Sequence, residues 1–181
     1  MYLSFAFALS EFLLMLFKNS RTTFAKTRND QGSMIFIWVT ITLGFTGGFI
    51  LAKYDFWNIV NYFLTGIGSI LILTGIIIRW LSIIQLGKSF TVDVAITDTA
   101  KLKQDGLYKR IRHPSYLGLL LIITGFSITM NSFYSFLVFI LPVVFAIIYR
   151  ISVEEKVLIN EFGHDYSEYA SKTKKLIPGI F

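Results

Sequence analysis

The sequence contains no cysteine, only three prolines and few charged residues. The lack of cysteine excludes a disulfide framework and a thiolate metal site, and the two histidines lie too far apart in sequence for zinc-ligand spacing. We therefore expect no metal. Charged residues make up 15% of the 181 residues, whereas hydrophobic residues make up 54% and the mean hydropathy is +0.63. This composition lies outside the range of soluble domains and predicts an integral membrane protein.

Long apolar runs account for most of the chain. They lie at residues 2–17, 34–52, 57–86, 115–130 and 132–149. Backbone groups in lipid must be satisfied internally, and these runs lack the alternation of barrel strands, so we predict five transmembrane helices in an all-α, multi-pass protein. The prediction is one domain, 1–181, with three helices in residues 1–85, a cytoplasmic loop at 86–114, a helical hairpin at 115–149 and a cytoplasmic, helical C-terminal segment at 150–181.

The basic residues predict the orientation. Five crossings place all seventeen lysines and arginines except Lys53 on one side, which the positive-inside rule assigns to the cytoplasm. The net charge of +6 then reports membrane topology, and we expect no binding of nucleic acid. A basic tail at residues 172–175 is expected to attract anionic membrane lipids. Nothing in the sequence points to an oligomeric state.

The last two apolar runs are separated by residues 130–132 alone, which predicts a tight antiparallel hairpin. The second run therefore returns to the level of His113, and Arg150 and Glu154 follow on one face of a continuing helix. Gly163 predicts a helix stop before a last short helix. Glu11 lies inside the first run, and we expect a buried, hydrogen-bonded carboxyl there.

The most polar motif spans residues 106–118. His113 precedes Pro114, so it is expected at or just before a helix N-terminus, where free N–H groups and the helix dipole favour an anion. Basic residues at 109, 110 and 112 lie in the same loop. Two interpretations remain open for this motif: an anion-binding site, or a topology signal followed by an ordinary helix boundary.

Several fragments of the sequence together resemble the isoprenylcysteine carboxyl methyltransferase family and its relatives among membrane phospholipid methyltransferases. They are Gly106-Leu107-Tyr108, Arg112-His113-Pro114-Ser115-Tyr116-x-Gly118, Arg150-x-x-x-Glu154-Glu155 and Phe162-Gly163-x-x-Tyr166-x-x-Tyr169. The resemblance covers about the last hundred residues, and their order and spacing make it specific where each fragment alone is weak.

The resemblance implies a donor, S-adenosylmethionine, with S-adenosylhomocysteine as product, bound between the loop before the fourth helix and the start of the C-terminal segment. It implies cofactor contacts from Leu102, Tyr108, His113, Pro114, Ser115, Tyr116 and Glu154. Asp93, Ala100 and Lys103 align with family contacts but differ in residue type, so only backbone contacts are implied there. Arg150 would address the acceptor, and Arg150 and Glu154 are the expected catalytic residues.

The residue chemistry agrees with such a donor. A helix N-terminus and His113 suit a carboxylate, Glu154 or Glu155 suits an amine or hydroxyl, and Tyr108 and Tyr116 can stack on a purine or flank a cation. If the acceptor is a carboxylate, Arg150 would pair with it and aim one oxygen at the methyl group.

The predicted function is methyl transfer to a lipophilic small-molecule or lipidated acceptor at a carboxylate oxygen. The alternatives are methylation of a phospholipid headgroup amine, a non-catalytic lipid-binding membrane protein, and a reductase resembling the sterol reductases, which carry a similar Arg-His-Pro-x-Tyr segment. A compact chain of this kind resembles prokaryotic members, which predicts a prokaryotic cell membrane with the site facing the cytoplasm.

Overall fold

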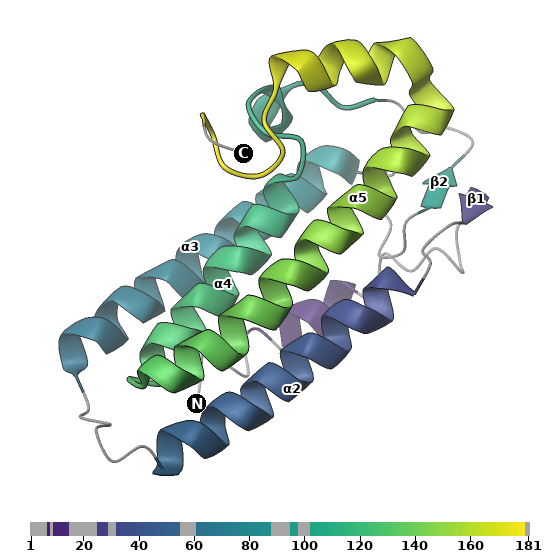
Figure 1. Ribbon diagram of the computed structural model, residues 1–181. Coiled ribbons are helices and arrows are strands. Elements are labelled where there is room, and N and C mark those ends of the chain that lie inside the picture. The colour runs from purple at the N-terminus through teal and green to yellow at the C-terminus, as the bar shows by residue number, and fades with distance from the viewer. Residues whose placement is uncertain are drawn as a thin grey trace.

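The computed structural model describes residues 7, 9–14, 32–54, 61–87 and 102–179, and the backbone of residues 25–28 and 95–97. In chain order the elements are β1 (Ala25–Arg28), α2 (Ser33–Tyr54), α3 (Tyr62–Leu86), β2 (Ala95–Thr97), the 3-10 helix η3 (Gly106–Lys109), α4 (Pro114–Thr129) and α5 (Phe133–Lys172). The long helices run alongside one another as a bundle, and η3 and the last part of α5 lie together at one end of it (Figure 1).

The helical architecture is confirmed, and the helices lie close to their predicted positions. Helices α2, α3 and α5 are long and apolar enough to cross a membrane, and α4 is a shorter apolar helix. The predicted first helix is described only at residues 7 and 9–14, which are helical. One feature was not predicted: β1 and β2 pair as a two-stranded antiparallel sheet, with Arg28 opposite Ala95. Strands of four and three residues are too short to produce a recognisable alternating pattern.

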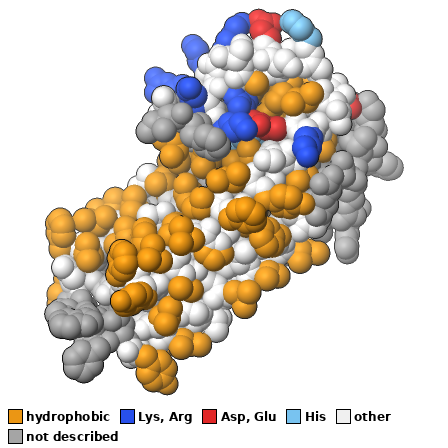
Figure 2. Space-filling model, in the orientation of Figure 1, with side chains coloured by type: hydrophobic (Ala, Val, Ile, Leu, Met, Phe, Trp, Pro, Cys, Tyr) orange, Lys and Arg blue, Asp and Glu red, His pale blue; other side chains and the backbone are white. Residues whose placement is uncertain are grey.

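The outer surface of the bundle is apolar along its length. Large hydrophobic side chains such as Ile35, Phe49, Ile84 and Phe145 are more than half exposed. Hydrophobic atoms cover the lower part of the view in Figure 2, whereas charged side chains gather at the end that carries η3 and the last part of α5. An apolar band of this size in contact with solvent is typical of a lipid-facing surface.

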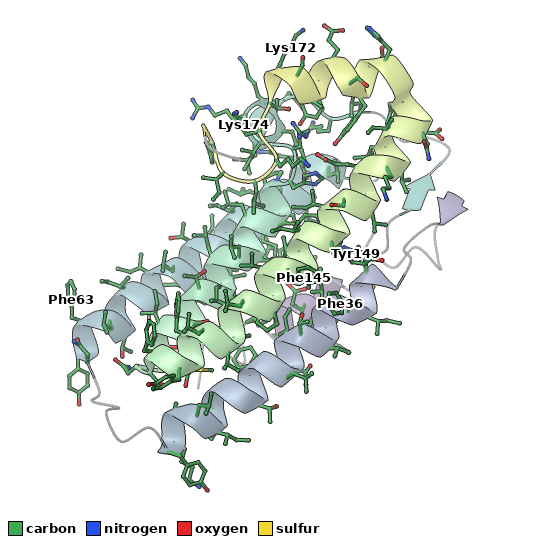
Figure 3. The ribbon with its side chains drawn as sticks, in the orientation of Figure 1. Phe36, Phe63, Phe145, Tyr149, Lys172 and Lys174 are labelled. Carbon is green, nitrogen blue, oxygen red and sulfur yellow. The ribbon has the colours of Figure 1, made fainter. Side chains whose placement is uncertain are left out.

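Aromatic side chains mark the opposite end of the bundle. Tyr54 at the end of α2, Tyr62 and Phe63 at the start of α3, and Phe133 and Tyr134 at the start of α5 are all exposed. Phe63 projects outward there in Figure 3, far from Lys172 and Lys174 at the charged end. Exposed aromatic rings at helix ends are typical of a membrane–water interface.

Glycines allow the helices to approach closely. In α3, a Cβ on Gly75 would lie 2.6 Å from the carbonyl oxygen of Gly118, and one on Gly68 would lie 2.6 Å from the carbonyl oxygen of Gly125. Both partners belong to α4, so the α3–α4 interface is built backbone against backbone. Gly66, by contrast, faces open space.

The predicted hairpin between α4 and α5 is present. Its turn contains Asn131 with a positive φ of 54°, and the side chain of Ser132 accepts a hydrogen bond from the N–H of Ser135 as the N-cap of α5. The side-chain oxygen of Asn131 also accepts a hydrogen bond of 3.0 Å from the N–H of Asn61, at the start of α3. The turn is therefore fixed against α3 at the aromatic end of the bundle.

Helix α5 continues beyond its apolar part and then bends sharply. Gly163 has a non-helical φ of 51° and ψ of −118°, so the helix ends and restarts there, as predicted. The segment after Gly163 folds across the end of the bundle above η3 (Figure 1). The following tail pairs with the segment before α4: Arg112 N–H donates to the carbonyl of Lys174 at 2.8 Å, and His113 N–H to that of Lys175 at 3.0 Å.

Candidate active site

His113 lies at the N-terminus of α4, as the sequence predicted. It is the N-cap residue, with φ −123° and ψ 58°, and Pro114 occupies the first helical turn and is fully buried. The His113 side chain is 2% exposed, and its ring stacks on that of Tyr116 with a centroid distance of 5.7 Å. Among the described residues, its Nε2 is a buried nitrogen without a hydrogen-bond partner.

Glu154 on α5 lies beside this helix start. Its Oε2 is 3.9 Å from Nδ1 of His113 and accepts a 2.6 Å hydrogen bond from the Tyr116 hydroxyl. The Glu154 side chain is 30% exposed, and no described residue donates a hydrogen bond to its Oε1. One carboxylate oxygen is therefore fixed, whereas the other has no hydrogen-bond donor among the described residues.

Arg150 completes a chain of polar contacts through Tyr116. Its Nε donates a 2.9 Å hydrogen bond to the Tyr116 hydroxyl, which in turn donates to Glu154. Arg150 is only 5% exposed, and its Nη1 donates to Oγ of Ser33 at 3.0 Å. The hydroxyl of Tyr116 thus joins the cation on one side to the acid on the other.

Glu155 organises a second set of charges behind His113. Its Oε1 lies 2.9 Å from Nε of Arg112 and 3.5 Å from Nε2 of His113, and its Oε2 lies 3.1 Å from Nζ of Lys175. The hydroxyl of Tyr166 donates to the same carboxylate at 3.3 Å. Because Glu155 is occupied by partners, Glu154 is the acid that is available for a ligand.

Tyr108 is held in η3 between α3 and the end of α5. It is 7% exposed, its hydroxyl donates to the carbonyl of Ser82 at 3.3 Å, and its own carbonyl accepts a 2.6 Å hydrogen bond from Tyr169. Burial, and then the negative charge of Glu154, raise the pKa of the Tyr108 phenol above its ordinary range. Tyr108 is therefore a neutral aromatic residue close enough to Glu154 to sense its charge.

Ser115, in the first turn of α4, faces away from Glu154 towards α3. Its hydroxyl and its carbonyl accept hydrogen bonds from Nη1 of Arg79, at 3.1 and 3.3 Å. Arg79 also pairs with Glu11 at 2.6 Å, which gives Glu11 the buried, hydrogen-bonded setting that was expected. Ser115, whose cofactor contact is implied by the family resemblance, therefore accepts its hydrogen bonds from Arg79.

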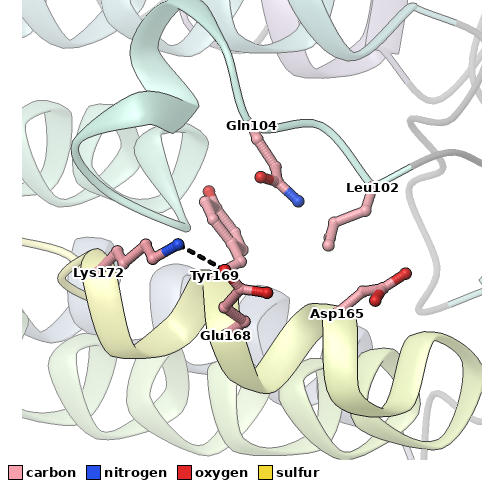
Figure 4. A pocket seen from close by; sticks show the side chains of 6 residues that line it. All are labelled: Leu102, Gln104, Asp165, Glu168, Tyr169 and Lys172. Atoms are coloured by element: carbon pink, nitrogen blue, oxygen red, sulfur yellow. Dashed lines mark hydrogen bonds and ion pairs between the residues drawn. The ribbon is translucent and has the colours of Figure 1, made fainter.

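A polar groove of about 360 Å³ opens beside η3. It is lined by Leu102, Gln104, Asp165, Glu168, Tyr169 and Lys172. Figure 4 shows Leu102 and Gln104 on one wall facing the C-terminal part of α5 on the other. Leu102 lines this groove together with Tyr169, whose hydroxyl donates to the backbone carbonyl of Tyr108. Lys103 pairs with Asp105 at 2.9 Å, and Asp93 and Ala100 lie outside the described residues.

The structure thus brings His113, Tyr116, Arg150 and Glu154 together, with Tyr108 nearby. Sequence reasoning missed Ser33, at the first residue of α2, because a lone serine carries no motif and lies 117 positions from Arg150. It also missed the partnership of Lys175 with Glu155, since the tail was interpreted only as a lipid-binding segment. The signal that could have revealed this pair is the opposite charge of the basic tail and of the adjacent acids Glu154 and Glu155.

The chain is similar to proteins of one known family. Residues 68–160, just over half of the chain, match the family model described as the isoprenylcysteine carboxyl methyltransferase (ICMT) family. A probable protein-S-isoprenylcysteine O-methyltransferase of Oryza sativa is 32% identical over 121 residues, 66% of this chain and 63% of the rice protein. A protein-S-isoprenylcysteine O-methyltransferase of Schizosaccharomyces pombe is 34% identical over 105 residues, 57% of this chain and 44% of that protein.

The fold is also similar to a solved structure, that of the eukaryotic intramembrane Ras methyltransferase ICMT. The TM-score is 0.68 at 24% sequence identity, and the match covers 79% of this chain and 52% of that one. The chain therefore spans between 44% and 63% of the length of the proteins named here. On the family match, which contains His113, Tyr116, Arg150 and Glu154, the chain belongs to the isoprenylcysteine carboxyl methyltransferase family.

Proposed function

We propose that this protein is a membrane methyltransferase that uses S-adenosylmethionine to methylate a carboxylate oxygen of a lipophilic acceptor. The observation that carries the proposal is the contact chain from Arg150 through the Tyr116 hydroxyl to Glu154. It joins a buried cation, which suits an acceptor carboxylate, to a partly exposed acid, which suits the amine or hydroxyl groups of a donor.

The donor side of the site fits S-adenosylmethionine in its chemistry. His113 is buried at a helix N-terminus that favours a carboxylate, and its Nε2 lies 3.5 Å from Oε1 of Glu155. Oε1 of Glu154 is accessible to an ammonium or a ribose hydroxyl. The rings of Tyr108 and Tyr116 offer aromatic faces for a purine or a sulfonium cation.

The acceptor side is formed by Arg150 and the first turn of α2. Arg150 lies among buried apolar neighbours of α5, such as Ile147 and Ile151, and bonds Ser33. A guanidinium in such surroundings holds a carboxylate in a fixed orientation and keeps it away from water, which raises the reactivity of the oxygen that remains free.

The chemistry needs alignment more than acid or base catalysis. The bound donor supplies an electrophilic methyl group; the new O–C bond forms as the C–S bond breaks, which leaves an ester and S-adenosylhomocysteine. Because a carboxylate is already deprotonated at neutral pH, no proton has to be removed from it. The role of Arg150, Tyr116 and Glu154 is therefore to hold the two reactants in line at contact distance.

A phospholipid headgroup amine is the second candidate acceptor, because the free oxygen of Glu154 can also receive an ammonium. The two are separated by supplying an isotopically labelled methyl donor to membranes that contain the protein and identifying the labelled lipids and proteins by mass spectrometry. A base-labile methyl ester supports carboxylate methylation, whereas label retained on a headgroup amine supports the second candidate.

We also propose that the chain crosses the membrane five times with the site on the cytoplasmic side. The exposed aromatic side chains at one end of the bundle and the charged side chains at the other end support this placement. Because the sequence has no cysteine, single-cysteine variants report it directly. In intact cells, a membrane-impermeant maleimide should label Lys53→Cys and not Lys174→Cys; the reverse result contradicts the orientation. The prokaryotic host stays a prediction.

The decisive experiment is calorimetric titration of the detergent-solubilised protein with S-adenosylhomocysteine. His113→Ala and Glu154→Ala should weaken binding about tenfold or more, because each removes a charged or polar ligand contact. Arg150→Lys should bind normally and lose turnover, since lysine keeps the charge without the planar fork. Lys156→Ala, an exposed residue of the same helix, is the matched control. A folded wild-type protein without affinity for S-adenosylhomocysteine refutes the proposal, and normal turnover by Arg150→Lys refutes the role of Arg150.

A further inference from the structure

Arg79 on α3 connects the N-terminal helical segment to the first turn of α4, which carries Tyr116 of the candidate site. Its Nε lies 2.6 Å from Oε1 of Glu11 and its Nη2 donates to Oε2 at 2.8 Å, and the two side chains are 12% and 6% exposed. Its remaining nitrogen, Nη1, donates to Oγ and to the carbonyl of Ser115. Each guanidinium nitrogen therefore has a partner, either in the N-terminal helical segment or in the first turn of α4.

A second link joins the same two helices without reaching α4. Nε1 of Trp80 donates a 2.8 Å hydrogen bond to Oγ of Ser10, which neighbours Glu11. The N-terminal segment is thus fixed to α3 by two adjacent polar contacts, and only that of Arg79 continues to Ser115. Trp80 therefore serves only as a packing contact between the two helices in this comparison, whereas Arg79 also contacts the helix that carries the site.

The backbone is shaped to bring Arg79 to α4. A Cβ on Gly118 would lie 2.7 Å from the backbone nitrogen of Arg79 and 2.8 Å from its Cβ, so the glycine makes room for this approach. A cation beside a helix N-terminus is unfavourable because it meets the positive end of the helix dipole, and the carboxylate of Glu11 compensates. Packing alone does not need such an ion pair, because apolar residues of similar volume pack buried helices at a lower desolvation cost.

We propose that Arg79, held by Glu11, is a positioning residue that fixes the first turn of α4 and thereby holds His113 and Tyr116 against Glu154. The link to donor binding rests on the proposed function; the link to the order of the α4 turn does not. Glu11 lies outside the residues that match the family model, so the inference adds the N-terminal segment of this chain to the apparatus that shapes the site.

The test compares Arg79→Lys with Trp80→Phe in the full-length, detergent-solubilised protein. Lysine keeps a charge beside Glu11, but it lacks the planar fork by which arginine spans both Glu11 and Ser115. Phenylalanine removes the hydrogen bond to Ser10 and leaves the contact with Ser115 intact. Three quantities are measured for each variant: the melting temperature, the affinity for S-adenosylhomocysteine, and hydrogen exchange of peptides that cover residues 113–120.

For Arg79→Lys we expect faster exchange at the start of α4 and an affinity for S-adenosylhomocysteine lower by about tenfold, with a small change in melting temperature. For Trp80→Phe we expect wild-type exchange in that peptide and wild-type affinity. Unchanged exchange in Arg79→Lys overturns the inference, as does equal exchange in both variants. Faster exchange in Arg79→Lys together with no binding by the wild-type protein upholds the positioning of α4 and refutes the proposed function instead.

Discussion

The hydroxyl of Tyr116 is the contact that joins the two halves of the site, and Tyr116→Phe removes it while keeping the ring. The ring still stacks on His113, so the change isolates one oxygen atom. That oxygen donates to Glu154 at 2.6 Å and accepts from Nε of Arg150 at 2.9 Å. Both bonds involve a charged partner, and such bonds contribute about 1.5–3 kcal/mol each.

The two losses are not equal. Glu154 has a side chain that is 30% exposed, so water can replace the lost donor and the cost there falls below that range, to about 1 kcal/mol. Arg150 is 5% exposed, so water cannot readily replace the Tyr116 oxygen that it loses, which costs about 2 kcal/mol. Together these give about 3 kcal/mol, or a melting temperature lower by roughly 6–12 °C for a chain of this size.

Thermal unfolding in detergent, followed by circular dichroism, measures this effect. Tyr134→Phe is the control, because it also removes one tyrosine hydroxyl, from a side chain of α5 at the aromatic end of the bundle that is 62% exposed. If the proposed function is correct, Tyr116→Phe also slows turnover by about 10- to 100-fold through the loss of alignment, with a smaller change in donor affinity. A melting temperature equal to that of Tyr134→Phe would show that the bridge contributes nothing and would refute the reasoning.

Two further predictions concern the framework. Gly75→Ala should lower the melting temperature strongly, because its methyl group would lie 2.6 Å from the carbonyl oxygen of Gly118. Gly66→Ala lies on the same helix in open space, and it should leave the free energy of unfolding unchanged or raise it by up to about 1 kcal/mol. Equal effects of the two alanines would contradict the close α3–α4 approach. Arg112→Lys should lower the free energy of unfolding by about 2 kcal/mol, because one ammonium cannot replace the guanidinium that bonds the carboxylate of Glu155 and the carbonyls of Ala170 and Thr173. Lys172 forms an exposed ion pair with Glu168, so Lys172→Ala should change the free energy of unfolding by less than about 1 kcal/mol. A larger loss in Lys172→Ala than in Arg112→Lys would contradict the argument that the buried pair contributes more.

The sequence by itself determined the features that depend on near neighbours. The apolar runs specify helices because lipid offers no partner for an unbonded backbone group, and α2 to α5 follow them closely. His113 caps α4 because Pro114 disfavours a helical conformation in the residue before it. The helix break at Gly163 likewise follows from a conformation that glycine adopts without steric cost.

Only the tertiary structure decided which distant side chains meet. The sequence placed Arg150, Glu154 and His113 at one end of a hairpin, but not the hydroxyl of Tyr116 between the first two. Nor could it pair Arg79 with Glu11, 68 positions away, or assign Glu155 to protein partners and leave Glu154 accessible. The physical reason is that helix packing decides which charged side chains meet. Helix packing depends on where glycines let two backbones approach, and a local sequence pattern does not specify how far apart two helices lie.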